Sequence, residues 1–519
     1  MNLIALGTRT AFALCLTPIL VAATDPTVTL KSGQLHGSMN PDGVAVFKNI
    51  PFAQPPVGDR RWKEPLPKKP WSGVRDATAF GPMCHQNDNK QFPHDEDCLQ
   101  LNIWTPKWPM TSRVPVMVWI HGGGNTAGSG IEALFHGDTL AGHGVVLVTV
   151  NYRLGIFGFF AHPGLSAESP HHATGNYGLM DQIRALQWVQ ENIAEFGGNP
   201  SNVTIVGESA GASDVNALIA SPLTKGLFQR VIAQSGPVGA TPTRSEAEKR
   251  GVDFAAKFGF SGDQSISKMR ALSFEELIAK LGPAGPGTGP GPVLNVSTDG
   301  WVLPDPPQKI FAEGRQQKVA LLIGNDSQEM QGGRGIPTTA DLRKTITERF
   351  GPLAERALNA YGLQGQEEPP VDPENGSILT QWTTDTAFRC GTVQELNWHT
   401  ATGNTGYQYQ FSRTVHGKEA LGAAHASEIP FVFGTLPVWQ RRNGYNDSDK
   451  DYSVIMQQYW TNFAKTGDPN GIKLVKWPQY DSVARAYLNF TDAGPVAKEG
   501  LRRTICDVHI ENQKRTTTR

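Results

Sequence analysis

Three separate parts of the sequence hold residue types that can carry out acyl transfer. The first, Gly207-Glu208-Ser209-Ala210-Gly211, has the Gly-x-Ser-x-Gly pattern of a serine nucleophile on a sharp turn between a strand and a helix. Glycines flank such a serine because the main chain crowds the turn and a side chain would clash. The N–H of Ala210, at the start of the following helix, is a free donor directed to where an oxyanion forms. The pattern therefore predicts Ser209 as a nucleophile.

A run of glycines supplies a second set of main-chain donors. Residues 114–120 form a continuous apolar segment that is too short for a helix, and His121-Gly122-Gly123-Gly124 follows it. This pattern is typical of a buried parallel strand that leads into a glycine loop. A bare Gly-Gly-Gly is more often a flexible turn. Because a nucleophile turn lies downstream, we expect the N–H groups of Gly123 and Gly124 to form an oxyanion hole with Ala210.

The third part must supply an acid and a histidine. In enzymes built on this serine turn, both follow the nucleophile in the chain. The acid is expected just after the predicted strand 319–323, where Asp326 and Glu329 are the candidates. A lone histidine on a loop is usually an exposed residue without a catalytic role. The downstream candidates for the base are His399, His416, His425 and His509.

The segments around these residues alternate between strand and helix patterns. Residues 27–53 read as an antiparallel hairpin opening, and short apolar strands are predicted at 145–150, 203–206 and 231–233. Helix-period segments cover 179–196 and 212–220. This order is that of a doubly wound α/β fold with a mostly parallel central sheet. The Gly- and Pro-rich segment 281–292 is predicted to be a surface loop on a cap over the site.

Composition and charge exclude several classes of partner. The chain has 519 residues, of which 39% are hydrophobic and 12 are tryptophans, so it can bury a large core. Its formal net charge is −1 and it has no long basic block, so the sequence predicts no basic surface that could bind nucleic acid. Arg61 and Glu96 can pair, and we expect an exposed ion pair worth under about 1 kcal/mol.

The N-terminus is typical of a secretory signal peptide. Residues 1–23 carry one charge, Arg9, followed by an apolar run at 11–21 and small residues at the end. A membrane anchor is the alternative, but this run is shorter than the roughly 20 residues that a span needs. No later segment is long enough to cross a membrane. We therefore expect a secreted, extracellular protein whose single mature domain is 24–519.

Loss of the signal peptide would remove Cys15 and leave four cysteines. An even number in a secreted chain predicts two disulfides, and four cysteines allow three pairings. We favour Cys84 with Cys98, which closes a small polar loop, and Cys390 with Cys506, which ties back the C-terminal region. No Cys-x-x-Cys spacing points to a metal site. A secreted chain can also be glycosylated at its sequons, which are Asn202, Asn295, Asn325, Asn375, Asn446 and Asn489; we expect Asn375 and Asn446 to be exposed, and Asn202 and Asn325 to stay bare.

Several longer motifs carry a family resemblance. Their order and spacing resemble those of the type-B carboxylesterases, the α/β-hydrolases that include cholinesterases and some fungal lipases, and the chain resembles secreted fungal-type members. The resemblance covers nearly the whole mature chain. The motifs, besides the serine turn and the glycine loop, are Glu96–Leu99, Asn151–Gly155, Gly178–Gln182, Phe196–Pro200 and Trp460–Pro469.

The resemblance implies an α/β-hydrolase fold, with antiparallel N-terminal strands and cap insertions, and a Ser-His-Glu triad. Glu329 matches the family's glutamate, although Gln328 stands where an aspartate is common. The segment 422–434 looks like the family's histidine loop, which favours His425 over His416. Glu208 and Ser235 would support these residues. No metal or organic cofactor is implied.

The implied activity is hydrolysis of small carboxylic esters through an acyl-enzyme. Cholinesterases carry a tryptophan in the first cysteine loop, whereas Phe92 is the only Phe, Trp or Tyr residue between Cys84 and Cys98, so a choline ester is not expected. Asn125 stands where a bulky apolar residue is frequent and is expected to place a polar group near the acyl pocket. The alternatives are a lipase for long-chain glycerides and a non-catalytic adhesion module on the same fold. The sequence does not reveal the oligomeric state.

Overall fold

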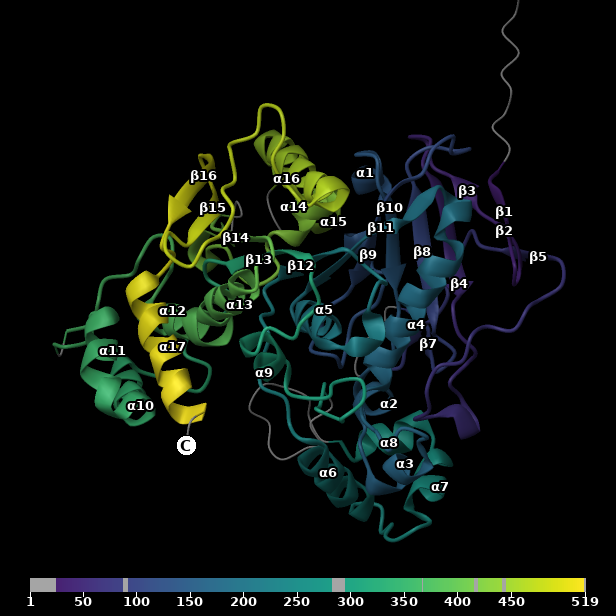
Figure 1. Cartoon of the computed structure of the whole chain (residues 1–519), viewed down its shortest axis with the longest axis horizontal. Helices are drawn as coiled ribbons and strands as arrows, with labels where there is room; N and C mark the ends of the chain where they lie inside the picture. Colours follow the sequence, from purple (N-terminus) through teal and green to yellow (C-terminus); the bar gives the residue numbers. More distant parts are fainter. Residues whose placement is uncertain are drawn as a thin grey trace, which may run out of the picture.

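A large mixed sheet forms the centre of the protein (Figure 1). The computed structural model describes residues 25–86, 92–281, 295–365, 367–414, 419–440 and 445–517. In this part of the chain the sheet has 11 strands in the order β16-β15-β14-β13-β12-β11-β9-β10-β8-β4-β3. From β3 to β16 their bounds are β3 Ser38–Met39, β4 Ala45–Pro51, β8 Gln100–Thr105, β9 Val114–Ile120, β10 Val146–Val150, β11 Gly198–Glu208, β12 Arg230–Gln234, β13 Ala320–Asp326, β14 Gly406–Phe411, β15 Ala486–Thr491 and β16 Gly494–Glu499.

The pairing within this sheet confirms the predicted α/β fold. Every neighbouring pair from β10 across to β15 is parallel, while β3, β4, β8 and β16 add antiparallel strands at the two edges. Smaller sheets contain β1 Thr27–Leu30, β2 Gly33–His36, β5 Val74–Asp76, β6 Met83–Cys84 and β7 His94–Asp95, and β1 and β2 form the predicted antiparallel hairpin. Because parallel strands end at one edge, the loops after β9, β11, β13 and β14 meet there.

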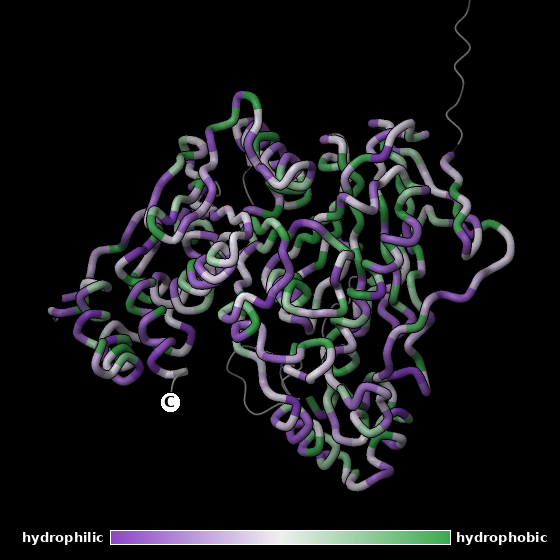
Figure 2. The backbone as a smooth tube through the Cα atoms, in the orientation of Figure 1, coloured by the Kyte–Doolittle hydropathy of each residue, from purple (hydrophilic) through white to green (hydrophobic). Residues whose placement is uncertain are grey.

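Helices cover both faces of the sheet, as the alternation of strand and helix patterns predicts. Side chains of β9 point alternately to the two faces: Val116 and Val118 join one hydrophobic cluster, and Met117 and Trp119 join the other. The first cluster contains residues of α4 and α5, and the second contains residues of α14 and α16. Figure 2 shows the corresponding concentration of hydrophobic residues along the central strands.

The helices match the predicted ones closely at the nucleophile. The predicted segment 179–196 forms α4 and a following 3-10 turn, and 212–220 forms α5. The helix bounds are α1 Asp138–Ala141, α2 Gly155–Phe159, α3 Pro163–Glu168, α4 Tyr177–Asn192, α5 Ala210–Ala220, α6 Arg244–Ala256, α7 Ser265–Arg270, α8 Phe274–Ala279, α9 Pro307–Ala312, α10 Thr339–Phe350, α11 Ala354–Ala360, α12 Ile378–Thr384, α13 Cys390–Ala401, α14 Ile429–Phe433, α15 Leu436–Gln440, α16 Asp447–Thr466 and α17 Arg503–Thr517.

A third hydrophobic cluster lies among α10, α11, α12, α13 and α17, which Figure 1 shows grouped at one end of the molecule. The Cys390–Cys506 disulfide lies within this cluster and joins α13 to α17, with a sequence separation of 116 residues. Both predicted disulfides are therefore confirmed, since Cys84 and Cys98 are also bonded.

One charged pair differs from its prediction. Arg61 and Glu96 form a bidentate ion pair that is mostly buried, with 8% and 13% of the side chains exposed, rather than a solvated pair. Arg61 also donates to the carbonyl oxygens of Arg270 and Leu272, so the pair ties three segments together. The physical reason is that burial of an Arg requires most of its donors to be satisfied.

Two predictions concern residues beyond the described ranges. The signal peptide lies outside them, as does almost all of the predicted surface loop at 281–292. Within the described residues, none of the helices has the length and apolar character needed to span a membrane.

Candidate active site

Ser209 lies on a strained turn between β11 and α5. Its φ is +57° and its ψ is −122°, a conformation that a residue with a side chain rarely adopts. A Cβ at Gly207 would lie 2.3 Å from the carbonyl oxygen of Gly211, and one at Gly211 would lie 2.2 Å from that of Ile120. The N–H of Ser209 donates to the carbonyl oxygen of Gln234 at 2.8 Å. The flanking glycines are thus required by close approach of the main chain, as the pattern predicts.

Ser209, His425 and Glu329 form one hydrogen-bonded chain. The Nε2 atom of His425 lies 2.9 Å from Ser209 Oγ, and its Nδ1 atom lies 2.5 Å from Glu329 Oε2. The N–H of His425 also donates to the carbonyl oxygen of Glu329 at 2.9 Å, which joins the two loops directly. Glu329 is 1% exposed, so its carboxylate is held in a medium of low polarity.

The rival candidates are not at these positions. Asp326, the alternative acid, donates its N–H to Glu329 Oε1 at 2.9 Å, and its carboxyl group is directed to other partners. His399 and His509 are buried elsewhere, where they contact the carbonyl oxygen of Val319 and the hydroxyl of Tyr361. His416 lies outside the described residues.

The glycine loop after β9 packs against the serine turn. A Cβ at Gly122 would lie 3.0 Å from Ser209 Cβ and 2.7 Å from the carbonyl oxygen of Glu208. Gly123 and Gly124 have φ values of +100° and +66°, which turn their peptide units into a conformation open mainly to glycine. Ala210 is the first residue of α5, so its N–H has no carbonyl partner within the helix. The three predicted donors therefore lie on two segments that meet beside Ser209.

Carboxylates surround the imidazole of His425. The Oε1 atom of Glu208 lies 3.1 Å from His425 Nε2. Burial alone lowers the pKa of His425, but the charges of Glu208 and Glu329 outweigh burial and raise this pKa to about 9. Burial raises the pKa of Glu208 as well. The two shifts are linked, because a protonated Glu208 no longer stabilises the imidazolium.

The two other residues singled out near the site have different surroundings. Ser235 is fully buried after β12 at a φ of +55°, and its N–H donates to the carbonyl oxygen of Gly324 at 2.8 Å. Among the described residues its hydroxyl has no hydrogen-bond partner, so it forms no hydrogen bond with His425 or Glu329. Glu208 thus contacts the imidazole, while Ser235 joins the ends of β12 and β13 through its N–H.

Asn125 does not present a free polar group. Its side chain is 1% exposed, and its amide nitrogen donates to Asp214 and Asn295 at 2.9 Å each. Its amide oxygen accepts from the hydroxyl of Tyr152 at 3.1 Å. The expectation of a polar group offered to an acyl pocket is wrong for this reason: buried Asp214 needs donors, and Asn125 supplies one.

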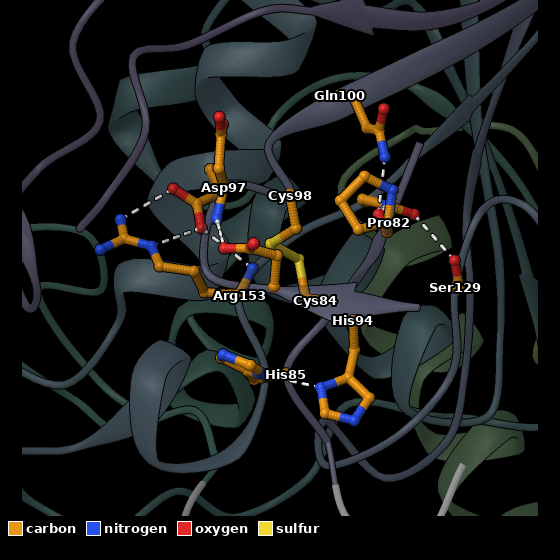
Figure 3. Close-up of a disulfide and its surroundings, with 12 residues drawn as sticks. Pro82, Cys84, His85, His94, Asp97, Cys98, Gln100, Ser129 and Arg153 are labelled. Atoms are coloured by element: carbon orange, nitrogen blue, oxygen red, sulfur yellow. Dashed lines mark hydrogen bonds and ion pairs between the residues drawn. A yellow bond between two sulfur atoms is a disulfide. The ribbon is translucent and has the colours of Figure 1, made fainter. Parts of the chain in front are cut away.

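The loop closed by Cys84 and Cys98 carries a histidine pair (Figure 3). The Nδ1 atoms of His85 and His94 lie 2.7 Å apart, so one ring donates to the other. The His85 ring stacks on Phe274 of α8 at 4.1 Å between centroids. This contact fixes the described part of the disulfide loop against the helices that follow α5.

Taken together, the geometry is that of a general base next to a hydroxyl nucleophile. A neutral His425 can accept the Ser209 proton at Nε2 while Glu329 fixes the proton on Nδ1. Main-chain N–H groups on two sides of Ser209 can receive negative charge that develops on a bound carbonyl oxygen. The arrangement suits acyl transfer, and among the described residues no group of three or more His, Cys, Asp or Glu side chains is placed to hold a metal.

Comparison with known proteins agrees with this chemistry. Residues 24–509 match the model of the carboxylesterase family. The chain belongs to this family. The carboxylesterase is 35% identical to fumonisin B1 esterase of Sphingopyxis macrogoltabida over 495 residues, covering 89% of this chain and 86% of that protein. It is 34% identical to liver carboxylesterase 1F of Rattus norvegicus over 532 residues, which cover 92% of this chain and 91% of that protein.

A solved structure shows the same fold. PNB esterase superposes with a TM-score of 0.79 and 34% identity, covering 93% of this chain and 100% of that one. The protein is therefore an α/β-hydrolase and a carboxylic ester hydrolase.

Two features of the carboxylesterase site were not predicted from its sequence. Arg153 and Asp181 form a buried bidentate ion pair, although both stand in motifs that carry the resemblance. Asp326 bonds to Glu329 and to Ser427, the residue before Glu428, so that two further buried acids adjoin Glu329 and His425. The only signal for the second feature was the proximity of each residue to Glu329 or His425 in the sequence.

Proposed function

We propose that this carboxylesterase hydrolyses small carboxylic esters through an acyl-enzyme on Ser209, with His425 as general base and Glu329 as the acid of the triad. The observation that carries the proposal is the chain of contacts from Ser209 Oγ through His425 to Glu329, at 2.9 and 2.5 Å. All three groups are in place, which argues against a non-catalytic adhesion module.

The proposed reaction has two halves. His425 Nε2 takes the Ser209 proton as Oγ bonds to the carbonyl carbon. The resulting oxyanion accepts hydrogen bonds from the N–H groups of Gly123, Gly124 and Ala210. Each such donor contributes about 3 kcal/mol to the transition state. The C–O bond to the alcohol then breaks, and the imidazolium gives its proton to the leaving oxygen. A water molecule, deprotonated by the same imidazole, attacks the acyl carbon. The bond from the acyl carbon to Oγ then breaks, the acid leaves, and the imidazolium returns its proton to Ser209 Oγ.

We propose a narrower range of ester substrates for this chain than its relatives as a group use. Named relatives include a fumonisin B1 esterase and a medium-chain fatty acyl-CoA hydrolase from Anas platyrhynchos, so relatives act on different acyl compounds. The disulfide loop of this chain has no tryptophan to bind a quaternary ammonium. We propose short to medium, non-choline esters, with long-chain glycerides as the lipase alternative.

We also propose that the protein is secreted. The support is the N-terminal pattern of residues 1–23 together with two disulfides, which are rare in reducing compartments. Of the sequons, Asn325 and Asn489 are fully buried, and the amide nitrogen of Asn375 donates to Asp372. Asn446 is exposed and caps α16 through its oxygen, which leaves its nitrogen for a glycan. Asn446 therefore remains a proposed glycosylation site.

The test is hydrolysis of short nitrophenyl esters by the wild type and by Ser209→Ala. We expect Ser209→Ala to lose all serine-dependent turnover, and Ser482→Ala, which changes an exposed serine, to retain wild-type activity. A phosphonate ester should add its mass to the wild type and not to Ser209→Ala. Turnover by Ser209→Ala at the wild-type rate would contradict the proposal. Comparison of C2 with C16 esters separates the esterase from the lipase.

A further inference from the structure

Four buried acidic residues gather behind the active site. Glu329, Glu208, Asp326 and Glu428 are 1%, 7%, 0% and 0% exposed. Burial raises the pKa of Glu208, Asp326 and Glu428, and the charges of neighbouring acids raise it further. His425 is the one basic group that forms an ion pair with any of them among the described residues. One imidazolium balances at most one negative charge, so this group cannot hold four charges at neutral pH.

Asp326 lies between the loops that carry the acid and the base. Its N–H donates to Glu329 Oε1 at 2.9 Å, and its Oδ2 accepts from the N–H of Ser427 at 3.3 Å. Ser427 follows His425 by two residues, so one aspartate is bonded to both loops. Among the described residues Asp326 forms no hydrogen bond with the imidazole, whereas Glu329 does.

Glu428 is fixed from the other side. Its Oε1 accepts from Gln234 Nε2 at 2.8 Å, and Gln234 Oε1 accepts from the indole N–H of Trp460 at 3.1 Å. Gln234 ends β12 and its carbonyl oxygen holds the N–H of Ser209. The position of Glu428 is thus tied to the sheet and to the nucleophile turn.

One oxygen of each of these two carboxyl groups has no donor among the described residues. Asp326 Oδ1 and Glu428 Oε2 are buried, and neither accepts a hydrogen bond from an N–H group of the described residues. Asp326 accepts from the N–H of Ser427, the residue before Glu428, so the two carboxyl groups are neighbours, and a hydrogen bond between them raises the pKa of Asp326 and lowers that of Glu428. Two ionised carboxylates have only acceptors, so this bond requires a proton on one of them.

We propose that Asp326 and Glu428 share one proton, and that this carboxyl–carboxylate bond clamps the Glu329 loop to the His425 loop. The proposal makes Asp326 a positioning residue and rests on the triad of the proposed function. The shared proton lies on Asp326, which donates it to Glu428. The charge stays on Glu428 because the amide of Gln234 donates to Glu428, whereas Asp326 has no side-chain amide partner.

The surroundings favour retention of this proton at neutral pH. Burial raises the pKa of Asp326 far above its usual range, and the charges of Glu428, Glu329 and Glu208 raise it further. The phenol of Tyr409 faces the same group and is itself uncharged, since burial also raises its pKa far above normal. His425 is the cation of the group, and it lies against Glu329 and Glu208.

The shared proton gives the enzyme an alkaline limit. When the pair loses its proton, two negative charges remain in contact in a buried site, and the clamp becomes repulsive. The two loops then separate and Glu329 and His425 lose their alignment. Because the pKa of the pair is raised, activity is retained below this pKa and falls as the pH rises through it.

The test uses Asp326→Asn, whose amide N–H donates to Glu428 as the protonated acid does but cannot be deprotonated. Both forms leave the pair with one negative charge. We measure kcat and KM for a short nitrophenyl ester from acid to strongly alkaline pH. We expect Asp326→Asn to keep kcat within about threefold of the wild-type value at neutral pH. The decrease of kcat at alkaline pH should be absent from this variant. Asp326→Ala should lower kcat about 10- to 100-fold with little change in KM, because the loops are no longer clamped.

Glu428→Gln provides the second variant if Asp326→Asn does not fold. Its amide oxygen can still accept from Gln234 and its amide nitrogen can donate to Asp326, so it should also lose the alkaline fall. An infrared difference spectrum between wild type and Asp326→Asn should contain the band of one protonated carboxyl group at neutral pH. Failure to see that band, or an unchanged alkaline fall in a folded amide variant, overturns the proposal. Activity of Ser209→Ala would instead overturn the proposed function.

Discussion

Substitution of Gly122 by alanine tests how closely the glycine loop must approach the nucleophile. A Cβ at this position would lie 2.7 Å from the carbonyl oxygen of Glu208, 2.8 Å from Glu208 Oε2 and 3.0 Å from Ser209 Cβ. The first distance is about 0.7 Å shorter than an ordinary contact of 3.4 Å, and a carbonyl of the strained turn is not a flexible group that can move aside. The loop must therefore shift away from Ser209 by several tenths of an ångström.

That shift would displace the N–H groups that follow Gly122. Loss of one oxyanion donor costs about 100- to 1000-fold in kcat, so we expect Gly122→Ala to lower kcat about 100-fold or more, with a smaller change in KM. The assay is steady-state hydrolysis of a nitrophenyl ester, with active-site titration to correct for inactive protein. Gly239→Ala is the matched control, because a Cβ there meets no atom within 4 Å. A Gly122→Ala enzyme within threefold of the wild-type kcat would refute this reasoning.

Other variants test the charges and the covalent links. Glu208→Gln removes a charge from beside the imidazole, so the pKa of His425 should fall and the acid limb of the kcat/KM profile should move to lower pH; a limb that stays in place would contradict this. Serine at both Cys390 and Cys506 opens a loop of 116 residues and should lower the free energy of unfolding by about 5 kcal/mol, against about 3 for the shorter disulfide, as chemical denaturation can measure. His399→Gln tests acid stability: burial lowers the pKa of His399 to about 4, so the unfolded chain binds more protons below about pH 6.5, and about 2 kcal/mol is lost by pH 5. The variant should have a flatter dependence of Tm on pH in that range, and an identical dependence would be evidence against this role.

The sequence predicted the parts of the site that depend on local main-chain geometry. The turn at Ser209 and the loop at Gly122–Gly124 need glycine at fixed positions, because a Cβ would meet backbone atoms there. Strands such as β9 and β10 could be predicted from continuous apolar segments, since both of their faces are buried. These signals lie within a few residues of each other and survive in a single sequence.

Features that depend on contacts between distant segments were not predicted. Asn125 was expected at an acyl pocket, but its partner Asp214 lies 89 residues away on α5, and no local pattern records that bond. Arg61 and Glu96 were expected in solvent because the segments that cover them follow much later in the chain. The Asp326–Glu428 contact is of the same kind. In the sequence, Asp326 and Glu428 each have the pattern of an ordinary acid near a proposed catalytic residue.

The positions of the disulfides along the chain have a consequence for the order of synthesis. If the N-terminal segment is removed during export, Cys84 and Cys98 are the first two thiols to emerge, and they have no competitor until Cys390 follows nearly 300 residues later. Cys390 must then wait for Cys506, close to the end of the chain. Vectorial export would thus select one pairing of the three possible. Refolding from the fully reduced, full-length chain presents all four thiols at once and loses that selection, so an oxidoreductase that reshuffles disulfides should increase the yield of active enzyme.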